Sequence, residues 1–284
     1  MKTIVTHMNP DLDSMASVWL LKRFGGDEWS EAEIKFVPAG STYKNKRVDS
    51  DPDVMHVDVG MGILDHHQFS DKKKCGAVLA LNYLIKNSKQ FETNEALERL
   101  VEVVRDIDWA GYLAYPQPTS DRYGLLFYEH GIISGLQKTL RNKSDKQIEL
   151  GLIILDAIYE AFKSKVDAEA IIKNDGIKFK TKWGKGMAAQ TDIFGFVTTA
   201  QAQGFPIVVS KGTSMGNIRI HAFEFGKINI DLSGVWETLK HKDPDATWFL
   251  HSSKKMVLNG SRANPDMIPT NLSLSDVIEV LKNA

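Results

Sequence analysis

The chain has 284 residues, and 35 Lys and Arg against 36 Asp and Glu give a formal net charge of −1. Hydrophobic residues make up 43% and charged residues 25%, a globular composition that excludes a largely disordered chain, a collagen-like fibre and a coiled-coil rod. The charge balance disfavours a strongly basic nucleic-acid binder. The single cysteine, Cys75, excludes an intramolecular disulfide and a cysteine-based zinc site.

The N-terminus has no apolar run long enough for a signal peptide. The most apolar later segment, 151–162, contains Asp156 and Glu160 and is too short to cross a bilayer. Together with the sparse cysteine, these features predict a cytoplasmic protein.

The first part of the chain alternates predicted strands and helices. The expected strands are 3–7, 34–37 and 54–59, and the expected helices are 13–24, 76–86 and 94–106. Gly25 and Gly26 are a typical stop for the first of these helices. The alternation indicates βαβ units and a mostly parallel sheet.

The remainder of the chain is expected to be helical from 120 to 174 and then to form short strands. A Lys- and Gly-rich stretch, 178–186, is expected to be a linker. The later expected strands are 206–210, 218–225, 247–251 and 255–258, and a final helix is expected at 275–282 after capping residues.

The expected fold class is therefore α/β. Residues 1–180 are expected to form a mostly parallel sheet domain flanked by helices. Residues 186–284 are expected to form a smaller mixed α+β domain.

Residues 7–14 join the first predicted strand to the first predicted helix, where open α/β sheets bind ligands. Here His7, Asp11 and Asp13 are candidate metal ligands, because carboxylates bind hard divalent cations and imidazole binds Mn, Fe or Zn. Asn9-Pro10-Asp11 is equally a good turn, and either Asp can cap the following helix. These residues by themselves fit both interpretations, a metal site and a capped turn.

Three further polar clusters follow along the chain. Asp58 lies at the end of an apolar strand, where it is either a metal ligand or a turn residue. Asp65-His66-His67 comes seven residues later, and adjacent histidines in this setting are rarely a chance arrangement. Asp106 and Asp108 end a helix, where carboxylates oppose the helix dipole and need a cation, either a metal or Arg105.

In order and spacing, these four clusters resemble the DHH phosphoesterase superfamily, which includes RecJ-type exonucleases, oligoribonucleases, exopolyphosphatases and family II inorganic pyrophosphatases. Residues 9–14 are similar to the pyrophosphatase form of the first motif. Asp65-His66-His67-Gln68, followed by Cys75-Gly76-Ala77, is similar to the metal-dependent protein hydrolase relatives, among them the melanocyte proliferating gene product. The resemblance covers residues 1 to 110.

The resemblance implies a site for two metal ions. The implied ligands are His7, Asp11 and Asp58 for one ion and Asp13, Asp58, His66 and Asp108 for the other. Four carboxylates would repel one another without cations, and two divalent ions neutralise them. The implied metal is Mn²⁺, with Mg²⁺ or Co²⁺ as alternatives. In the catalytic roles, Asp65 would orient a histidine, and His67 would bind a phosphate oxygen or protonate the leaving group.

Candidate substrate-binding residues lie near the C-terminus. A candidate phosphate clamp consists of His251, Ser252, Lys254, Lys255 and Arg262. Arg219 and His221 share one face of a predicted strand and form a second candidate pair. A solvated sheet edge would explain the same residues. Ser253 replaces an Arg of the pyrophosphatase signature, and the Gly-Gly-Gly-His signature of DHH exonucleases is absent, so the substrate stays open.

The sequence thus predicts a Mn²⁺-dependent phosphoesterase that hydrolyses a nucleotide or short-oligonucleotide phosphodiester by two-metal water activation. The alternatives are a phosphoanhydride hydrolase acting on pyrophosphate or polyphosphate, and a non-catalytic metal- or nucleotide-binding protein. The expected partner is a phosphate-containing small molecule or a short oligonucleotide. Neither a membrane nor a long nucleic-acid duplex is expected, and a homodimer is left open.

Overall fold

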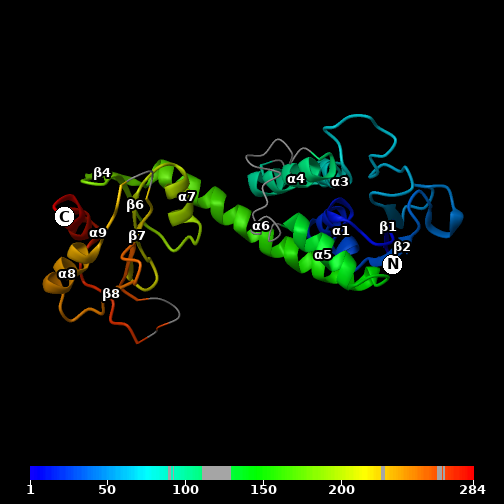
Figure 1. Cartoon of the computed structure of the whole chain (residues 1–284). Coiled ribbons are helices and arrows are strands. Elements are labelled where there is room, and N and C mark those ends of the chain that lie inside the picture. Colours follow the sequence, from blue (N-terminus) through cyan, green and yellow to red (C-terminus); the bar gives the residue numbers. More distant parts are fainter. Residues whose placement is uncertain (89–90, 92, 111–128, 225–227, 261–263, 265) are drawn as a thin grey trace. The chain divides into compact units, whose positions relative to one another are not determined.

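The computed structural model describes residues 1–88, 91, 93–110, 129–224, 228–260, 264 and 266–284 (Figure 1). The chain forms two compact units, Met1–Phe162 and Lys163–Ala284, and helix α6 (Ser144–Asn174) contributes residues to both. The predicted α/β fold class is confirmed. The predicted domain limits of 1–180 and 186–284 stay a prediction.

The first unit is built on a three-stranded parallel sheet with strand order β2-β1-β3. Its strands are β1 (Thr3–His7), β2 (Glu33–Val37) and β3 (Val54–His56). Parallel pairing brings the carboxyl ends of the strands to one edge. The third strand ends earlier than expected, so that Asp58 lies in the turn after it, beyond a single bridge between Val57 and Leu64.

Helices cover this sheet and bury its core. They are α1 (Leu12–Phe24), α2 (Asp27–Ser30), the 3-10 turn η1 (Tyr43–Asn45), α3 (Gly76–Asn87), α4 (Glu95–Asp108), α5 (Glu129–Thr139) and α6. Helix α1 is buried along its length from Leu12 to Leu21, as expected for a helix without a polar face. Asp11 caps it by accepting a hydrogen bond from the backbone N–H of Ser14. The start of α1 is thus fixed directly after β1.

Helix α6 is tied to α1 by a partly buried polar contact. The indole N–H of Trp19, which is fully buried, donates to Asp156 Oδ1 at 2.8 Å. Arg23 also pairs with Asp156, at 2.8 Å. Within the part of the chain that the structure describes, neither α6 nor any other helix is long and apolar enough to cross a membrane.

The second unit contains a six-stranded mixed sheet in the order β4-β5-β6-β7-β9-β8. The strands are β4 (Ile177–Thr181), β5 (Gly184–Gln190), β6 (Ile207–Lys211), β7 (Ile218–Ala222), β8 (Phe249–Leu250) and β9 (Met256–Leu258). The helices are α7 (Phe196–Ala202), α8 (Ser233–Lys242) and α9 (Leu274–Lys282). Alternate residues of β6 belong to two separate cores, so both faces of the sheet are packed there.

The stretch 178–186 is not a linker, because it forms most of the β4–β5 hairpin. Phe179 is buried, whereas Lys178, Lys180 and Lys185 are exposed. β4 is an edge strand, and exposed lysines are common on edge strands because they discourage pairing with other chains. The lysines that indicated a linker therefore lie on the exposed face of a hairpin.

The contact between α1 and α6 predicts a stability effect of Asp156→Ala. The substitution leaves the buried indole N–H of Trp19 without its acceptor, so the free energy of unfolding should fall by roughly 1–3 kcal/mol. Urea denaturation followed by circular dichroism measures this change. Glu149→Ala on the same helix removes only a solvent-exposed pair with Lys146 and should leave the free energy of unfolding close to that of the wild type. Equal effects of the two variants would mean that Asp156 acts only as a surface charge.

Candidate metal centre

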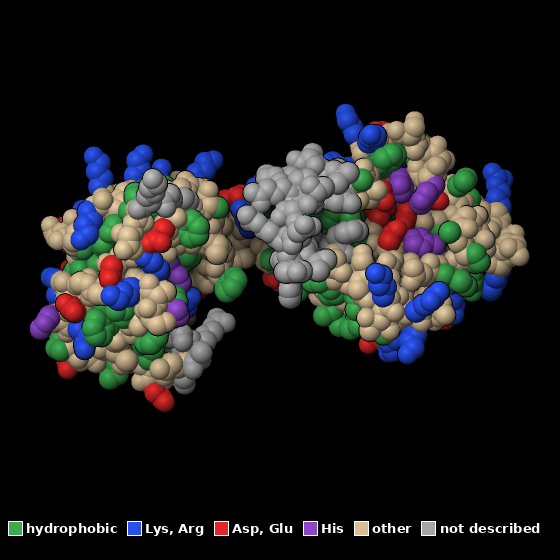
Figure 2. Space-filling view, viewed as in Figure 1, with side chains coloured by type: hydrophobic (Ala, Val, Ile, Leu, Met, Phe, Trp, Pro, Cys, Tyr) green, Lys and Arg blue, Asp and Glu red, His purple; other side chains and the backbone are tan. Residues whose placement is uncertain are grey.

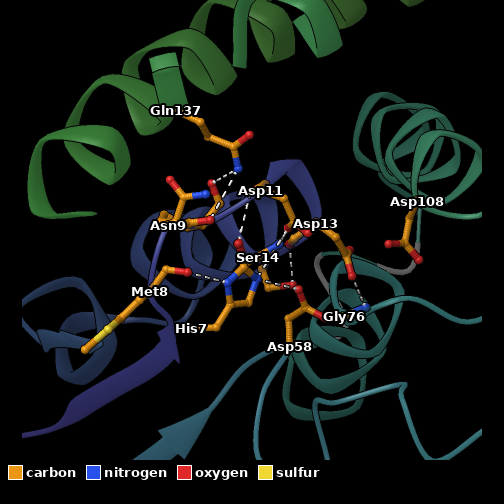
Figure 3. A network of polar contacts seen from close by, with 12 residues as sticks. His7, Met8, Asn9, Asp11, Asp13, Ser14, Asp58, Gly76, Asp108 and Gln137 are labelled. Carbon is orange, nitrogen blue, oxygen red and sulfur yellow. Dashed lines mark hydrogen bonds and ion pairs between the residues drawn. The ribbon is translucent and has the colours of Figure 1, made fainter. Parts of the chain in front are cut away.

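All six residues that the sequence resemblance implies as metal ligands come together at the carboxyl edge of the first sheet. Figure 3 shows five of them, His7, Asp11, Asp13, Asp58 and Asp108. His7 ends β1, Asp11 and Asp13 begin α1, and Asp58 follows β3. His66 lies in the loop before α3, and Asp108 is the last residue of α4. Three overlapping groups have ligand atoms within 4.8 Å of one another: His7 with Asp11 and Asp58, Asp13 with His66 and Asp108, and Asp58 with His66 and His67.

Asp58 is shared between the two sides of this cluster. Its Oδ2 lies 3.5 Å from His7 Nε2, and its Oδ1 lies 3.4 Å from His66 Nε2. The side chain is 2% exposed. The backbone of Asp58 has a φ of +52°, in the left-handed region that residues other than glycine seldom adopt. Such strain collects at functional sites, where the surrounding structure holds it in place.

The remaining separations also suit ligands around shared cations. His7 Nε2 lies 3.7 Å from Asp11 Oδ1, and His66 Nε2 lies 3.7 Å from Asp13 Oδ2 and 3.6 Å from Asp108 Oδ2. These distances are too long for ordinary hydrogen bonds. Two atoms bound at about 2.1 Å to one ion lie about 3.0–3.4 Å apart at angles of about 90–109°, which is close to the separations here.

Buried polar atoms without partners give a second test of whether cations fit. Among the described residues, Asp58 Oδ1 and both ring nitrogens of His66 are buried and have no hydrogen-bond partner. A buried carboxylate oxygen left unsatisfied is costly, and a bound cation removes that cost. The donor set of carboxylates and imidazoles therefore fits divalent metal ions.

The pKa values of the cluster reflect uncompensated negative charge. Burial, with repulsion from Asp58 and Asp108, raises the pKa of Asp13 well above its usual value. Burial also raises the pKa of Asp108 to about 6, with His66 opposing the shift and Asp58 adding to it. Burial would lower the pKa of His7, but its contacts with Asp11 and Asp58 outweigh that effect and raise it to about 11.

A pH dependence of stability follows from the raised pKa values of Asp13 and Asp108. Both exceed the ordinary value of 3.8, so the folded protein binds more protons than the unfolded chain between that value and about 6. Without metal, the melting temperature should fall as pH rises from about 4 to about 7. The melting temperature should fall in EDTA but not in Mn²⁺, because bound metal would compensate the negative charge of the ionised carboxylates. An equally steep fall with Mn²⁺ present would contradict a cation site.

Asp13 is held by the N-terminus of α3. The backbone N–H groups of Gly76 and Ala77 donate to its carboxylate at 2.6 and 2.8 Å, where the helix dipole favours an anion (Figure 3). The buried thiol of Cys75 also contacts Asp13. Burial is the main cause that raises the pKa of Cys75, and the negative charge of Asp13 adds to it. This support was not predicted from the sequence, because it joins residues 63 positions apart.

Gly76→Ala should weaken metal binding, because a Cβ there would lie 3.0 Å from both Asp13 Oδ2 and the Cβ of Asp58. We expect at least about a tenfold loss of Mn²⁺ affinity, or about 1.4 kcal/mol, in a chelator competition assay. Gly135→Ala in α5 is the matched control, since a Cβ there meets nothing within 4 Å. Unchanged affinity in Gly76→Ala would show that the close approach is not needed.

The loop before α1 is anchored by residues far along the chain. Asn9, whose φ is +55°, donates its N–H to Ser144 Oγ at 3.0 Å. Its side chain accepts from Gln147 at 3.1 Å, and Gln137 donates to the carbonyl of Pro10 at 2.9 Å. These contacts fix the loop that places Asp11 and Asp13 (Figure 3). No local sequence signal pointed to either glutamine.

Asp65 orients His67. Its Oδ1 accepts from His67 Nδ1 at 2.6 Å and from the His67 backbone at 3.0 Å, while Oδ2 accepts from the N–H of Met61 at 2.6 Å. Burial alone would raise the pKa of Asp65, but these hydrogen bonds lower it. The His67 side chain is 57% exposed. With Nδ1 taken by Asp65, Nε2 is the ring nitrogen available to a ligand.

The two aspartates at the end of α4 have different surroundings. Asp106 pairs with Arg105 at 2.7 Å. Asp108 instead faces His66. Asp108 as the last metal ligand stays a prediction.

The candidate substrate residues of the second unit are engaged with their own neighbours. Lys254 pairs with Asp231 at 3.1 Å, and Lys255 pairs with Glu224. His251 Nδ1 contacts Ser253 at 2.8 Å. Ser252 is exposed, and Arg262 lies outside the described residues. The binding of a substrate phosphate by these clamp residues stays a prediction.

Arg219 and His221 lie together on β7, two residues apart on one face of the strand. Both are partly exposed. Burial, with the nearby charge of Arg219, lowers the pKa of His221. Their role in binding substrate also stays a prediction.

Residues 4–162 match the family model for ChrB, C-terminal domain, which is more than half of the chain. The chain belongs to the ChrB C-terminal domain family. The match ends at Phe162, where the first unit also ends, so the ChrB C-terminal domain contains the whole candidate metal centre. The second unit lies outside the match. No curated protein matches the chain.

Two solved structures are similar to this ChrB-family chain at 13% identity. One is the pGpG-specific phosphodiesterase PggH from Vibrio cholerae, with 99% of this chain and 96% of that chain covered and a TM-score of 0.32. The other is RecJ in complex with Mg²⁺ from Thermus thermophilus, with 99% and 49% covered and a TM-score of 0.33. The chain thus spans about half the length of RecJ. TM-scores at this level carry no argument about activity.

Proposed function

We propose that the chain is a metal-dependent phosphoesterase that hydrolyses a nucleotide-type or short-oligonucleotide phosphodiester with two Mn²⁺ ions. The proposal rests on Asp58, whose two buried oxygens face two separate histidine-containing groups. The proposed ligands are His7, Asp11 and Asp58 for one ion and Asp13, Asp58, His66 and Asp108 for the other. The resemblance of the four motifs to the DHH phosphoesterases supports the same assignment.

The proposed hydrolysis depends on the charges of the two metal ions and the four carboxylates, and on His67. Two divalent ions supply Lewis acidity toward a phosphoryl group and toward a water molecule. The four carboxylates balance the charge of those ions, so negative charge on the substrate is not repelled. Asp65 fixes the ring of His67 through Nδ1, which leaves Nε2 to bind a phosphate oxygen or to protonate the leaving oxygen.

The complete set of ligand side chains favours turnover over a purely binding role.

The first test compares Asp58→Asn and His67→Gln with the wild-type chain in Mn²⁺. Substrates are a cyclic dinucleotide, short DNA and RNA oligonucleotides, pyrophosphate and tripolyphosphate. We expect hydrolysis of a nucleotide diester by the wild type. Asp58→Asn should lose bound metal and activity together, because it removes a charge shared by both ions. His67→Gln should keep its metal and lose about 10²–10⁴-fold in kcat.

Asp106→Asn and Asp108→Asn form a matched pair for the metal assignment. Asp106 pairs with Arg105, so Asp106→Asn should keep metal content and activity, whereas Asp108→Asn should reduce both. Metal content is measured by mass spectrometry of the purified variants. Loss of metal in His67→Gln, or hydrolysis of pyrophosphate alone, would contradict the proposed roles and substrate.

A further inference from the structure

Large apolar side chains are exposed beside the metal centre, on the same loops that carry its residues. Met8 directly follows β1, and Met61 lies in the loop between β3 and Asp65. Phe69 lies two residues after His67. Their exposed fractions are 55%, 62% and 40%. Figure 2 shows hydrophobic side chains around the acidic and histidine side chains on this face.

We call these three exposed residues, Met8, Met61 and Phe69, the apolar rim, and metal chemistry does not explain their exposure. Exposed apolar side chains that gather at one place mark binding surfaces, whereas single ones are ordinary. A purely ionic ligand such as pyrophosphate gains nothing from them, because its surface is charged oxygen. The rim therefore indicates a ligand with an apolar or aromatic part next to its phosphate.

Phe69 has a fixed position relative to the metal centre and carries a cation beside its ring. Its backbone N–H donates to the carbonyl of His66 at 2.8 Å. The ammonium of Lys74 lies 4.1 Å from the centroid of the Phe69 ring, within cation–π distance.

The ammonium of Lys74 also lies 3.9 Å from Asp71 Oδ2, in an exposed ion pair that a phosphate oxygen would have to replace or share. The backbone of Lys74 is held on both sides. Its N–H donates to the carbonyl of Asp71 at 3.0 Å, and its carbonyl accepts from the indole N–H of Trp109 at 2.6 Å. Trp109 directly follows Asp108. The aromatic ring and the ammonium are thus both attached to segments that carry residues of the metal centre.

We propose that Phe69 and Lys74 bind one nucleotide unit of the substrate, with the base stacked on Phe69 and a phosphate oxygen paired with Lys74. Aromatic rings stack every base through its π-face, so the site accepts nucleotides without strong base preference. Lysine supplies a point charge for the phosphate. The inference rests on the proposed function and assigns the residues that would hold one nucleotide of its substrate.

Binding of AMP and of ribose 5-phosphate to the Mn²⁺-loaded full chain tests the inference by calorimetry, without any need for turnover. The two ligands share the sugar phosphate and differ in the base. Phe69→Ala should weaken AMP binding about tenfold, equivalent to about 1.4 kcal/mol, and leave ribose 5-phosphate binding unchanged. Phe69→Trp should keep AMP affinity. Lys74→Ala should weaken both ligands, because both carry the phosphate.

Ile153→Ala is the control, since Ile153 is an exposed apolar residue of α6 outside the rim. It should change neither affinity. Equal loss of AMP and ribose 5-phosphate in Phe69→Ala, or wild-type AMP affinity in that variant, would overturn base stacking on Phe69. No binding of AMP by the wild type would overturn it as well. Base-dependent AMP binding without hydrolysis of any phosphoester would instead remove the proposed function and keep the nucleotide site.

Discussion

The concentration of negative charge at one sheet edge is the constraint on which the first unit depends. Asp13 and Asp58 are almost fully buried, and Asp11 and Asp108 lie beside them. Buried like charges raise one another's free energy steeply in a medium of low dielectric. The fold offsets part of this cost by aiming the N-terminus of α3 at Asp13. Bound cations would offset the rest, and the strain and loop anchors around the site hold the candidate ligands in place.

The local features of the site could be predicted from the sequence because they depend on neighbouring residues. Strand ends, helix starts and the capping function of Asp11 follow from short patterns, and the structure has them. The spacing of the four motifs along alternating strands and helices indicated a shared edge, since parallel strands end on the same side. The orientation of a histidine by Asp65 was implied by resemblance and has its geometric counterpart in His67.

The features that could not be predicted depend on contacts between distant segments. Gly76 lies 63 residues from Asp13, and Gln147 lies 138 residues from Asn9. Neither contact has a local periodicity or motif that would reveal it. The prediction for the β4–β5 hairpin was wrong for another reason. The stretch 178–186 is rich in exposed lysines, as a linker would be, and Phe179 and Trp183 are the large apolar residues in it that are buried. Composition alone does not separate an edge strand from a solvated connection.

The left-handed backbone of Asp58 restricts which residues can occupy the centre of the site. Glycine adopts this conformation freely but has no oxygen to offer. Asparagine tolerates this conformation but carries no charge. Glutamate carries the charge, but it does not share the tolerance of aspartate for the left-handed region. Aspartate alone combines the permitted backbone with a negative, two-oxygen group. The identity of residue 58 is thus set jointly by conformation and electrostatics, which leaves this position less freedom to vary than any single requirement would impose.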